Sequence, residues 1–147
     1  ALFRERQIHK QYEAIARWRP DLAYPFEHAS CLQESGDFFR MGEAEGVVNS
    51  RTIVDVLEHN ATWARYLLSP ISGKRHQLRV HMAALGMPLL YDSLYPQVRP
   101  VNSGDYAQPL QLLAKSVQFV DPITQAEQQF VSQQQLLPVP EADFVWA

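Results

Sequence analysis

The segment between Pro70 and Pro88 constrains the fold most, because its ends carry residues that start and stop a helix. Ser72 is a favourable N-cap, since its side-chain oxygen can accept a hydrogen bond from a free backbone N–H of the first turn. Gly86 is placed to end the helix, and Pro88 prevents its continuation. The sequence therefore predicts a helix from about Gly73 to Leu85.

The rest of the chain is typical of β-strands, because β-branched and aromatic residues form short runs between glycine and proline residues. The runs 51–57 and 62–68 flank His59 and Asn60, which predicts an antiparallel hairpin with a short loop. Pro70 stops the second of these strands. Further strands are expected at 8–18, in short pieces over 19–49, at 112–120 and at 127–132.

Mostly antiparallel strands with few helices indicate an α+β fold on an antiparallel or mixed β-sheet. With 147 residues, of which 46% are hydrophobic, the chain can bury one core. The glutamines at 133–135, together with Pro138 and Pro140, predict a loose C-terminal tail over residues 132–147.

The charge balance is mildly acidic, since the formal net charge is -3 at pH 7, which excludes a strongly basic surface over the whole chain. Any contact with RNA must therefore be local. The single cysteine, Cys31, cannot form a disulfide within the chain, and the sequence contains no secretion leader and no apolar run of membrane-spanning length. These features predict a protein of the reducing cytoplasm.

The expected helix carries two arginines beside its apolar side. On a helical wheel, Leu78, Met82 and Leu85 form the buried stripe. Arg75 and Arg79 project from the shoulder of this stripe. A partly buried guanidinium is unfavourable without an acceptor, and the helix has no acidic residue three or four positions from Arg79. Two acceptors remain open: a carboxylate elsewhere in the fold, and an RNA phosphate.

Lys74 and Arg75 fall in the first turn of the expected helix, where free N–H groups and the helix dipole already favour an anion. An incoming phosphate would relieve this unfavourable placement of two cations. Metal binding is not expected, because His76 and His81 are five residues apart and lie on different helical faces, and Cys31 is the only thiol.

The run PISGKRHQLRVH from Pro70 to His81 is similar to a signature of RluA-type RNA pseudouridine synthases, P-x-T-G-R-T-H-Q-[IL]-R-V-H. The resemblance continues through 85–89 and 92–95, which match the family's L-G-x-P-[IL] and D-x-x-Y. Two weaker matches flank this region: R-x-x-x-K-x-Y-x-A begins at Arg6, and L-H-A-x-x-L-x-F-x-H-P resembles residues 112–122.

The resemblance implies that residues 1–131 form the C-terminal portion of a pseudouridine synthase catalytic domain, with 132–147 as a C-terminal tail. The chain opens on Ala1 rather than Met and reads there like the end of a helix, so we expect a truncated or processed chain. Several departures from the family pattern indicate a divergent subfamily: Lys74 and Arg75 for Arg and Thr, Tyr91 and Pro96 for Gly, and Leu113 and Asp121 for His.

Family members convert uridine to pseudouridine in ribosomal or transfer RNA without a cofactor, and the target base must leave its stack to enter the pocket. By position, Tyr12 resembles the pocket tyrosine that packs on the uracil and handles its C5 proton. Arg79 resembles the arginine that pairs with the catalytic aspartate, and Leu112 an apolar wall of the pocket. The other residues expected to contact RNA are Lys10, Lys74, Arg75 and His76.

The family's nucleophilic aspartate lies in a motif similar to H-R-L-D-x-x-[ST]-S-G, and no aspartate of this chain has that context. Because that carboxylate is the covalent participant, we expect this polypeptide alone to be inactive. The absent half would also contribute strands, so an exposed apolar edge and self-association are expected. Two other functions remain open: a non-catalytic RNA-binding module, and a structural or interaction domain on the same fold.

Overall fold

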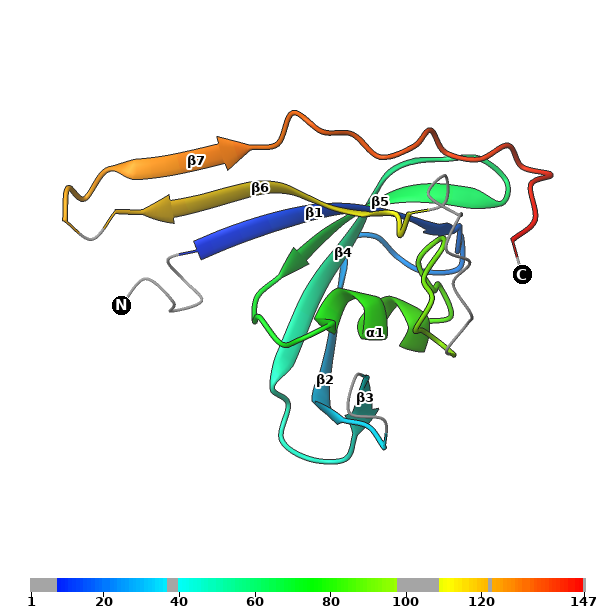
Figure 1. The fold of residues 1–147 in the computed structure, drawn as a ribbon, viewed down its shortest axis with the longest axis horizontal. Coiled ribbons are helices and arrows are strands. Elements are labelled where there is room, and N and C mark those ends of the chain that lie inside the picture. Colours follow the sequence, from blue (N-terminus) through cyan, green and yellow to red (C-terminus); the bar gives the residue numbers. More distant parts are fainter. Residues whose placement is uncertain (1–7, 37–39, 98–108, 122, 147) are drawn as a thin grey trace.

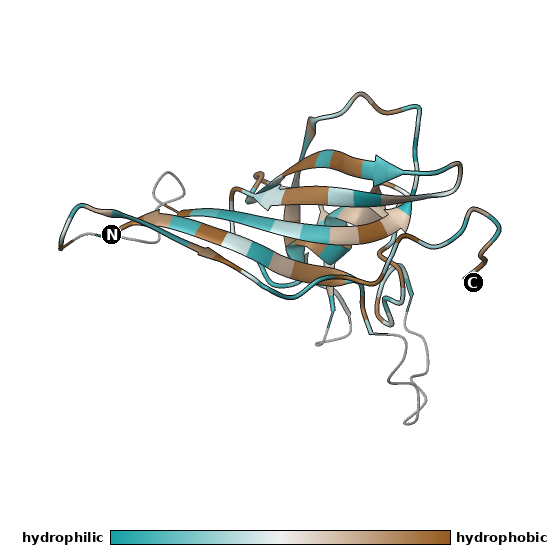
Figure 2. Ribbon diagram, turned by 90° about the horizontal axis from the view of Figure 1, so that it is seen from above, coloured by the Kyte–Doolittle hydropathy of each residue, from teal (hydrophilic) through white to brown (hydrophobic). Residues whose placement is uncertain are grey.

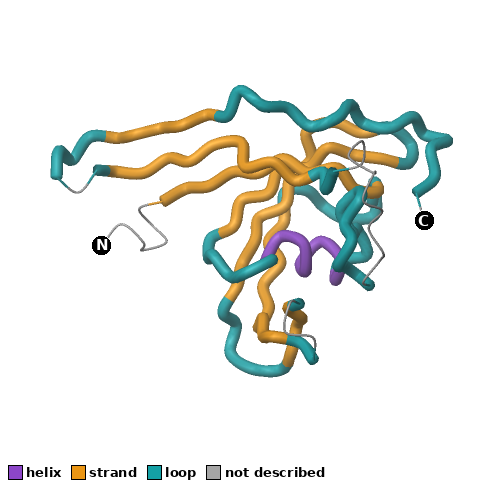
Figure 3. The backbone as a smooth tube through the Cα atoms, viewed as in Figure 1, coloured by secondary structure: helices purple, strands orange, loops and turns teal. Residues whose placement is uncertain are grey.

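The computed structural model describes residues 8–36, 40–97, 109–121 and 123–146. Within these residues the chain forms one seven-stranded sheet and one helix, α1 (Gln77–Ala84), as Figures 1 and 3 show. The strands are β1 (Ile8–Arg17), β2 (Phe26–Glu34), β3 (Met41–Ala44), β4 (Ser50–His59), β5 (Trp63–Pro70), β6 (Leu112–Val120) and β7 (Glu127–Val131). Neighbours are antiparallel throughout, in the order β3-β2-β4-β5-β1-β6-β7, which confirms the expected α+β fold.

The expected strands are present, with small shifts at their ends. The hairpin formed by β4 and β5 closes around residues 60–62, and β6 covers the whole of the strand expected at 112–120. The short pieces expected over 19–49 are β2 and β3. The opening segment with Arg6, and Pro122 of the weak second match, lie outside the described residues.

The sheet is strongly twisted, so that β2 and β4 run at a steep angle to β6 and β7 (Figure 1). The outer parts of β1, β6 and β7 extend away from the rest of the molecule (Figure 1). The helix α1 packs beside β3, β4 and β5. The edge strands are β3 and β7, and edge strands present backbone groups that another chain can pair with.

Alternating residues of β1 pack on opposite faces of the sheet, as the two-residue period of a strand requires. Ala14 and Ala16 join the larger core cluster, which also contains the buried side of α1. Ile15 belongs to a second cluster, where it packs with Trp63. Figure 2 shows the same alternation of apolar and polar residues along the strands.

The C-terminal segment covers the second cluster and does not lie loose. The Trp63 indole N–H donates to the Phe144 carbonyl oxygen at 3.1 Å, and Asn60 Nδ2 donates to the Pro140 carbonyl oxygen at 2.7 Å. The expectation of a loose tail is therefore wrong, because apolar residues spaced through this polar segment find an apolar surface to cover. The residues that pack there are Leu136, Val139, Phe144 and Trp146.

The helix begins at Gln77 rather than at Gly73, and Ser72 is not its N-cap. His76 occupies the N-cap position with a left-handed φ of 56° and makes no side-chain cap hydrogen bond. Ser72 Oγ instead donates to Gln77 Oε1 at 2.8 Å, so the preceding residues form a loop around the Gln77 amide. Gly86 follows the helix with a φ of 79°, as its expected role in ending the helix requires.

Burial extends over more of α1 than the expected stripe. Leu78 and Met82 are buried as expected and Leu85 is partly buried, but Val80 and His81 are buried as well. The helical wheel missed this because β2, β3 and β4 cover further sides of the helix: Val80 packs with Leu32, and the His81 ring lies against the Ser30 and Thr52 hydroxyls. Across the described residues, no helix is long and apolar enough to cross a membrane.

Candidate active site

A cleft of about 290 Å³ lies where β1 and the start of β6 face the loop before α1, near the lower end of the size range of ligand sites. Among the residues that the structure describes, the charged side chains of the lining are basic and none is a carboxylate. Three of the chain's 13 lysine and arginine residues, Lys10, Lys74 and Arg79, line this cleft. The lining consists of Lys10, Tyr12, Pro70, Ser72, Gly73, Lys74, His76, Gln77, Leu78, Arg79 and Leu112.

The cleft brings together all of the site residues expected from the sequence except Arg75, which is exposed and is not part of the lining. Lys10 and Tyr12 are two residues apart on β1 and therefore share one face of the strand. Leu112 is the first residue of the neighbouring strand β6. The pairing of β1 with β6 shifts register between Gln11 and Tyr12, and such bulges are common beside functional sites.

Gln77 holds the loop that forms the opposite wall of the cleft. Its Oε1 accepts hydrogen bonds from Ser72 Oγ at 2.8 Å and from the Lys74 backbone N–H at 3.2 Å. Its Nε2 donates to the Arg51 carbonyl oxygen and to Thr52 Oγ1, both at 2.9 Å. One buried amide thus ties the basic loop to β4. The family signature contained this glutamine, but sequence reasoning gave it no role.

His76 is oriented by hydrogen bonds that begin on β3. The Met41 backbone N–H donates to the Tyr95 hydroxyl oxygen at 2.8 Å, so the Tyr95 O–H is available to donate to His76 Nδ1, also 2.8 Å away. A neutral His76 then carries its proton on Nε2. Burial, followed by the charges of Arg79 and Arg75, lowers the pKa of His76. His76 therefore lines the cleft as an uncharged N–H donor.

Arg79 finds a carboxylate within this chain. Its Nε and Nη2 donate to the two carboxylate oxygens of Asp92 at 3.0 and 2.6 Å, in a bidentate pair. Asp92 is 0% exposed, and its Oδ1 also accepts the backbone N–H groups of Leu94 and Tyr95. The buried carboxylate is therefore fully paired, as a buried charge requires.

Asp92 is thus a carboxylate elsewhere in the fold, one of the two kinds of acceptor that the sequence left open for Arg79. The bonds from the Leu94 and Tyr95 N–H groups hold Asp92 in a turn, and no pattern in the sequence indicated its bond to Arg79. Among the described residues, Nη1 of Arg79 makes no hydrogen bond, and Arg79 lines the cleft. The guanidinium thus keeps one donor nitrogen for an incoming oxygen atom.

A tyrosine on a strand, an arginine on a helix and a basic loop thus surround one cleft. The chain belongs to the RNA pseudouridylate synthase family, whose sequence model matches residues 1–84. The resemblance seen in the residues of the signature is thereby confirmed.

Curated proteins similar to this chain include RluA proteins. The dual-specificity RNA pseudouridine synthase RluA of Escherichia coli K12 is 38% identical over 104 residues, which cover 66% of this chain and 46% of that protein. The RluA of Salmonella typhi is 34% identical over 125 residues, which cover 82% of this chain and 54% of that protein. The chain therefore spans about half the length of the curated relatives it matches.

Solved structures show the same fold. Human RNA pseudouridylate synthase domain containing 1 superposes with a TM-score of 0.68 at 25% identity, over 90% of this chain and 57% of that chain. Human RNA pseudouridylate synthase domain containing 4 superposes with a TM-score of 0.68 at 24% identity, over 91% of this chain and 60% of that chain. The arrangement of strands around α1 is thus the one found in pseudouridylate synthase domains.

Proposed function

We propose that this chain supplies one wall of the active site of an enzyme that isomerises uridine to pseudouridine in ribosomal or transfer RNA. The observation that carries the proposal is the shared cleft. Tyr12, Arg79 and Leu112 lie on three different elements, far apart in the sequence, and line one cavity with basic side chains. No cofactor takes part in this proposal.

Tyr12 and Leu112 form the part of the cleft that accepts the base. An aromatic ring stacks on a flipped base, and an apolar side chain beside it excludes water. Tyr12 in this role also handles the C5 proton of uracil. Arg79 contacts the nucleophilic aspartate through Nη1, while Asp92 fixes the guanidinium through Nε and Nη2.

The basic side chains hold the RNA backbone. Lys10 and Lys74 line the cleft and neutralise phosphates, Arg75 is exposed next to it, and His76 adds an uncharged donor. Binding that depends on phosphate contacts weakens as salt rises, because counterions compete for the same charges. We therefore expect the affinity for RNA to fall steeply with salt concentration.

The proposed reaction needs a nucleophilic carboxylate that the 147 residues do not present in its motif. The polypeptide alone is therefore inactive, and activity requires the protein segment that carries the H-R-L-D-type motif. The lone thiol of Cys31 is buried and free, which suits work in the reducing cytoplasm.

Mapping pseudouridines in cellular RNA with and without the gene tests the proposed function. We expect one site or a few sites to lose pseudouridine when the gene is deleted, and to regain it when the intact gene returns. An unchanged map in the deletion strain contradicts the proposal. The sites that change also identify the RNA.

A second candidate is a non-catalytic RNA-binding module. It is favoured by one observation: the basic cleft is present in a chain without the nucleophile motif. Salt-sensitive RNA binding combined with an unchanged pseudouridine map would support this alternative. Absence of RNA binding would instead favour the third function, a structural or interaction domain on the same fold.

Self-association belongs to the same proposal, through the free edge of the sheet. The edge strand β7 exposes Phe130 by 62% and Val131 by 52%, and Phe119 of β6 stacks on Phe130. Exposed apolar edge strands pair readily with other chains. Phe130→Lys should shift the chain from dimer to monomer in sedimentation measurements. A monomeric wild-type chain contradicts this part of the proposal.

A further inference from the structure

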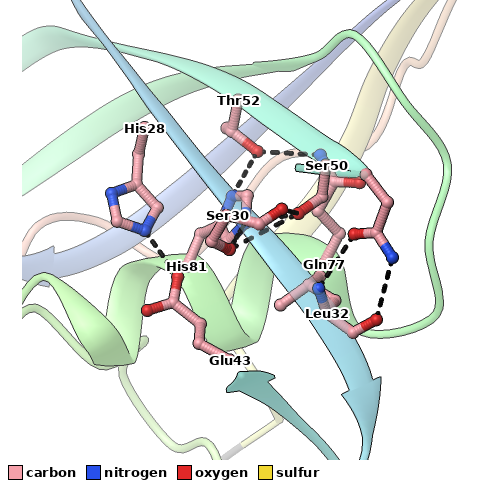
Figure 4. A network of polar contacts seen from close by, with 9 residues as sticks. His28, Ser30, Leu32, Glu43, Ser50, Thr52, Gln77 and His81 are labelled. Carbon is pink, nitrogen blue, oxygen red and sulfur yellow. Dashed lines mark hydrogen bonds and ion pairs between the residues drawn. The ribbon is translucent and has the colours of Figure 1, made fainter. Parts of the chain in front are cut away.

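A second polar cluster lies beside α1 and shares no residue with the lining of the cleft. It joins His28 of β2, Glu43 of β3 and His81 of α1, and their ligand atoms lie within 4.8 Å of one another (Figure 4). His28 Nε2 and Glu43 Oε2 are 2.6 Å apart. The rings of His28 and His81 meet edge to face, with centroids 4.7 Å apart.

We propose that His28, Glu43 and His81 form a binding site for a divalent transition metal ion, with zinc as the best fit. Zinc takes imidazole nitrogens and carboxylate oxygens at about 2.0–2.2 Å, whereas magnesium and calcium prefer oxygen ligands throughout. Three protein ligands leave the fourth tetrahedral position to water. The site is accessible, since the side chains of His28 and Glu43 are 22% and 30% exposed.

The surroundings of His81 suit a metal ligand. Its Nδ1 lies 2.9 Å from Thr52 Oγ1, so a proton on Nδ1 can be donated to that hydroxyl and leave the Nε2 lone pair to a metal. Ser50 Oγ lies 3.1 Å from Nε2 but donates its own hydrogen to the Ser30 carbonyl oxygen. Burial lowers the pKa of His81 to about 4, so the imidazole is uncharged at neutral pH.

Metal binding would replace the hydrogen bonds of His81 Nε2 and of the His28–Glu43 pair by metal–ligand bonds. His81 Nε2 lies 3.0 Å from Ser30 Oγ, and this hydroxyl would turn toward another acceptor when a metal binds Nε2. The His28–Glu43 contact would open by the width of the ion. Only two partly exposed side chains must move, while His81, which is 0% exposed, stays in place.

The site would anchor the short edge strand β3 to the helix. Glu43 and Met41 both belong to this four-residue strand, and the Met41 N–H is the donor that orients Tyr95 and, through it, His76. A metal that fixes Glu43 therefore stabilises β3 at a distance from the cleft. Ligands that bind only the folded state raise its stability by mass action.

Titration of the chelator-treated chain with Co²⁺ and Zn²⁺ tests the proposal. We expect one ion per chain, the visible absorption bands of tetrahedral Co²⁺, their loss when Zn²⁺ is added, and a higher Tm with Zn²⁺. His28→Ala and Glu43→Gln should each weaken binding about tenfold or more. Both side chains are partly exposed, so both variants should fold.

His9→Ala is the matched control, because His9 is exposed and lies outside the cluster. It should bind Zn²⁺ and Co²⁺ as the wild-type chain does. The proposal is overturned if the wild-type chain shows no tetrahedral Co²⁺ bands and no Zn²⁺-dependent Tm. It is equally overturned if His28→Ala and Glu43→Gln bind as tightly as His9→Ala. None of these readouts depends on RNA or on pseudouridine formation.

Discussion

Arg79 and Asp92 form a buried ion pair beside the cleft. Asp92 is fully buried, and the Arg79 side chain is only 16% exposed. Water therefore cannot replace either partner, and loss of one partner would leave the other charge buried and unpaired. The pair also sits against Tyr95, whose ring centroid is 5.4 Å from the guanidinium carbon. One arginine thus supports the fold and faces the cleft at the same time.

Asp92→Ala should lower the free energy of unfolding by about 3–5 kcal/mol, because it leaves the Arg79 charge largely buried without its partner. Asp21→Ala is the control and should lower the free energy of unfolding far less, since the ion pair of Asp21 with Arg19 is exposed to solvent. Urea unfolding measures both. Equal losses in the two variants would contradict a structural role for Asp92.

The surroundings of His76 make the free energy of unfolding decrease as the pH falls. Its pKa is lowered in the folded chain by burial and then by the charges of Arg79 and Arg75, while Asp92 acts in the opposite direction. Below the unfolded pKa of about 6.5, the unfolded chain takes up this proton more readily than the folded one, so stability falls.

Wild-type chain should therefore lose more unfolding free energy than His76→Gln between about pH 7 and about pH 5. Above about pH 7 the pH dependence of the two proteins should be the same, since the imidazole is neutral in both states. Urea unfolding at a series of pH values checks this. Parallel curves for the two proteins over the whole range would show that His76 keeps an ordinary pKa.

The loop before α1 and the C-terminal segment are held in place by side-chain contacts with distant parts of the chain. The loop is held by Gln77, which is 3% exposed, and the segment is held by apolar side chains over Trp63. Both segments lack regular structure, so their order comes from these contacts rather than from a helix or strand ladder.

Gln77→Ala should loosen the loop, because the hydrogen bonds that Gln77 Oε1 accepts from Ser72 Oγ and the Lys74 N–H are lost. We expect a loss of about 2–3 kcal/mol in unfolding free energy, and faster hydrogen exchange at the Lys74 amide. Gln129→Ala, at an exposed position of β7, should change stability by less than about 0.5 kcal/mol. Unchanged exchange at Lys74 would refute the role of Gln77.

Phe144→Ala should lower the free energy of unfolding by about 1–2 kcal/mol, because it removes a partly buried ring. The ring centroids of Phe144 and Trp63 are 5.8 Å apart. The neighbouring Val145 is 76% exposed, so Val145→Ala should cost less than about 0.5 kcal/mol. Thermal unfolding followed by Trp fluorescence compares the two. A wild-type Tm in Phe144→Ala would mean that the segment is loose after all.

Local sequence patterns were enough to predict the strands. They did not predict the features that depend on a contact with a distant side chain. The strand at 112–120 follows from its own apolar and β-branched residues. The start of α1 could not be predicted, because Ser72 bonds to the Gln77 side chain rather than to a backbone N–H. The partner of Arg79 lies thirteen positions away, beyond the end of α1, where helical periodicity gives no information.

The molecule as a whole is an acidic chain, and its described residues form a basic cleft from β1, β6 and the loop before α1. Most cleft residues could be predicted from the family signature and the K-x-Y-x-A strand, because they belong to these two motifs. Their meeting in one cavity required the antiparallel pairing of β1 with both β5 and β6.

The most direct measurement is the release of the uridine C5 hydrogen from RNA by the complete gene product. Tyr12→Phe keeps the ring but removes the hydroxyl, so release should fall by about two orders of magnitude or more while RNA affinity stays near wild type. Tyr91→Phe, outside the cleft lining, should react like wild type. Wild-type release by Tyr12→Phe, or none by the unaltered protein, would contradict the assignment of this cleft to pseudouridine formation.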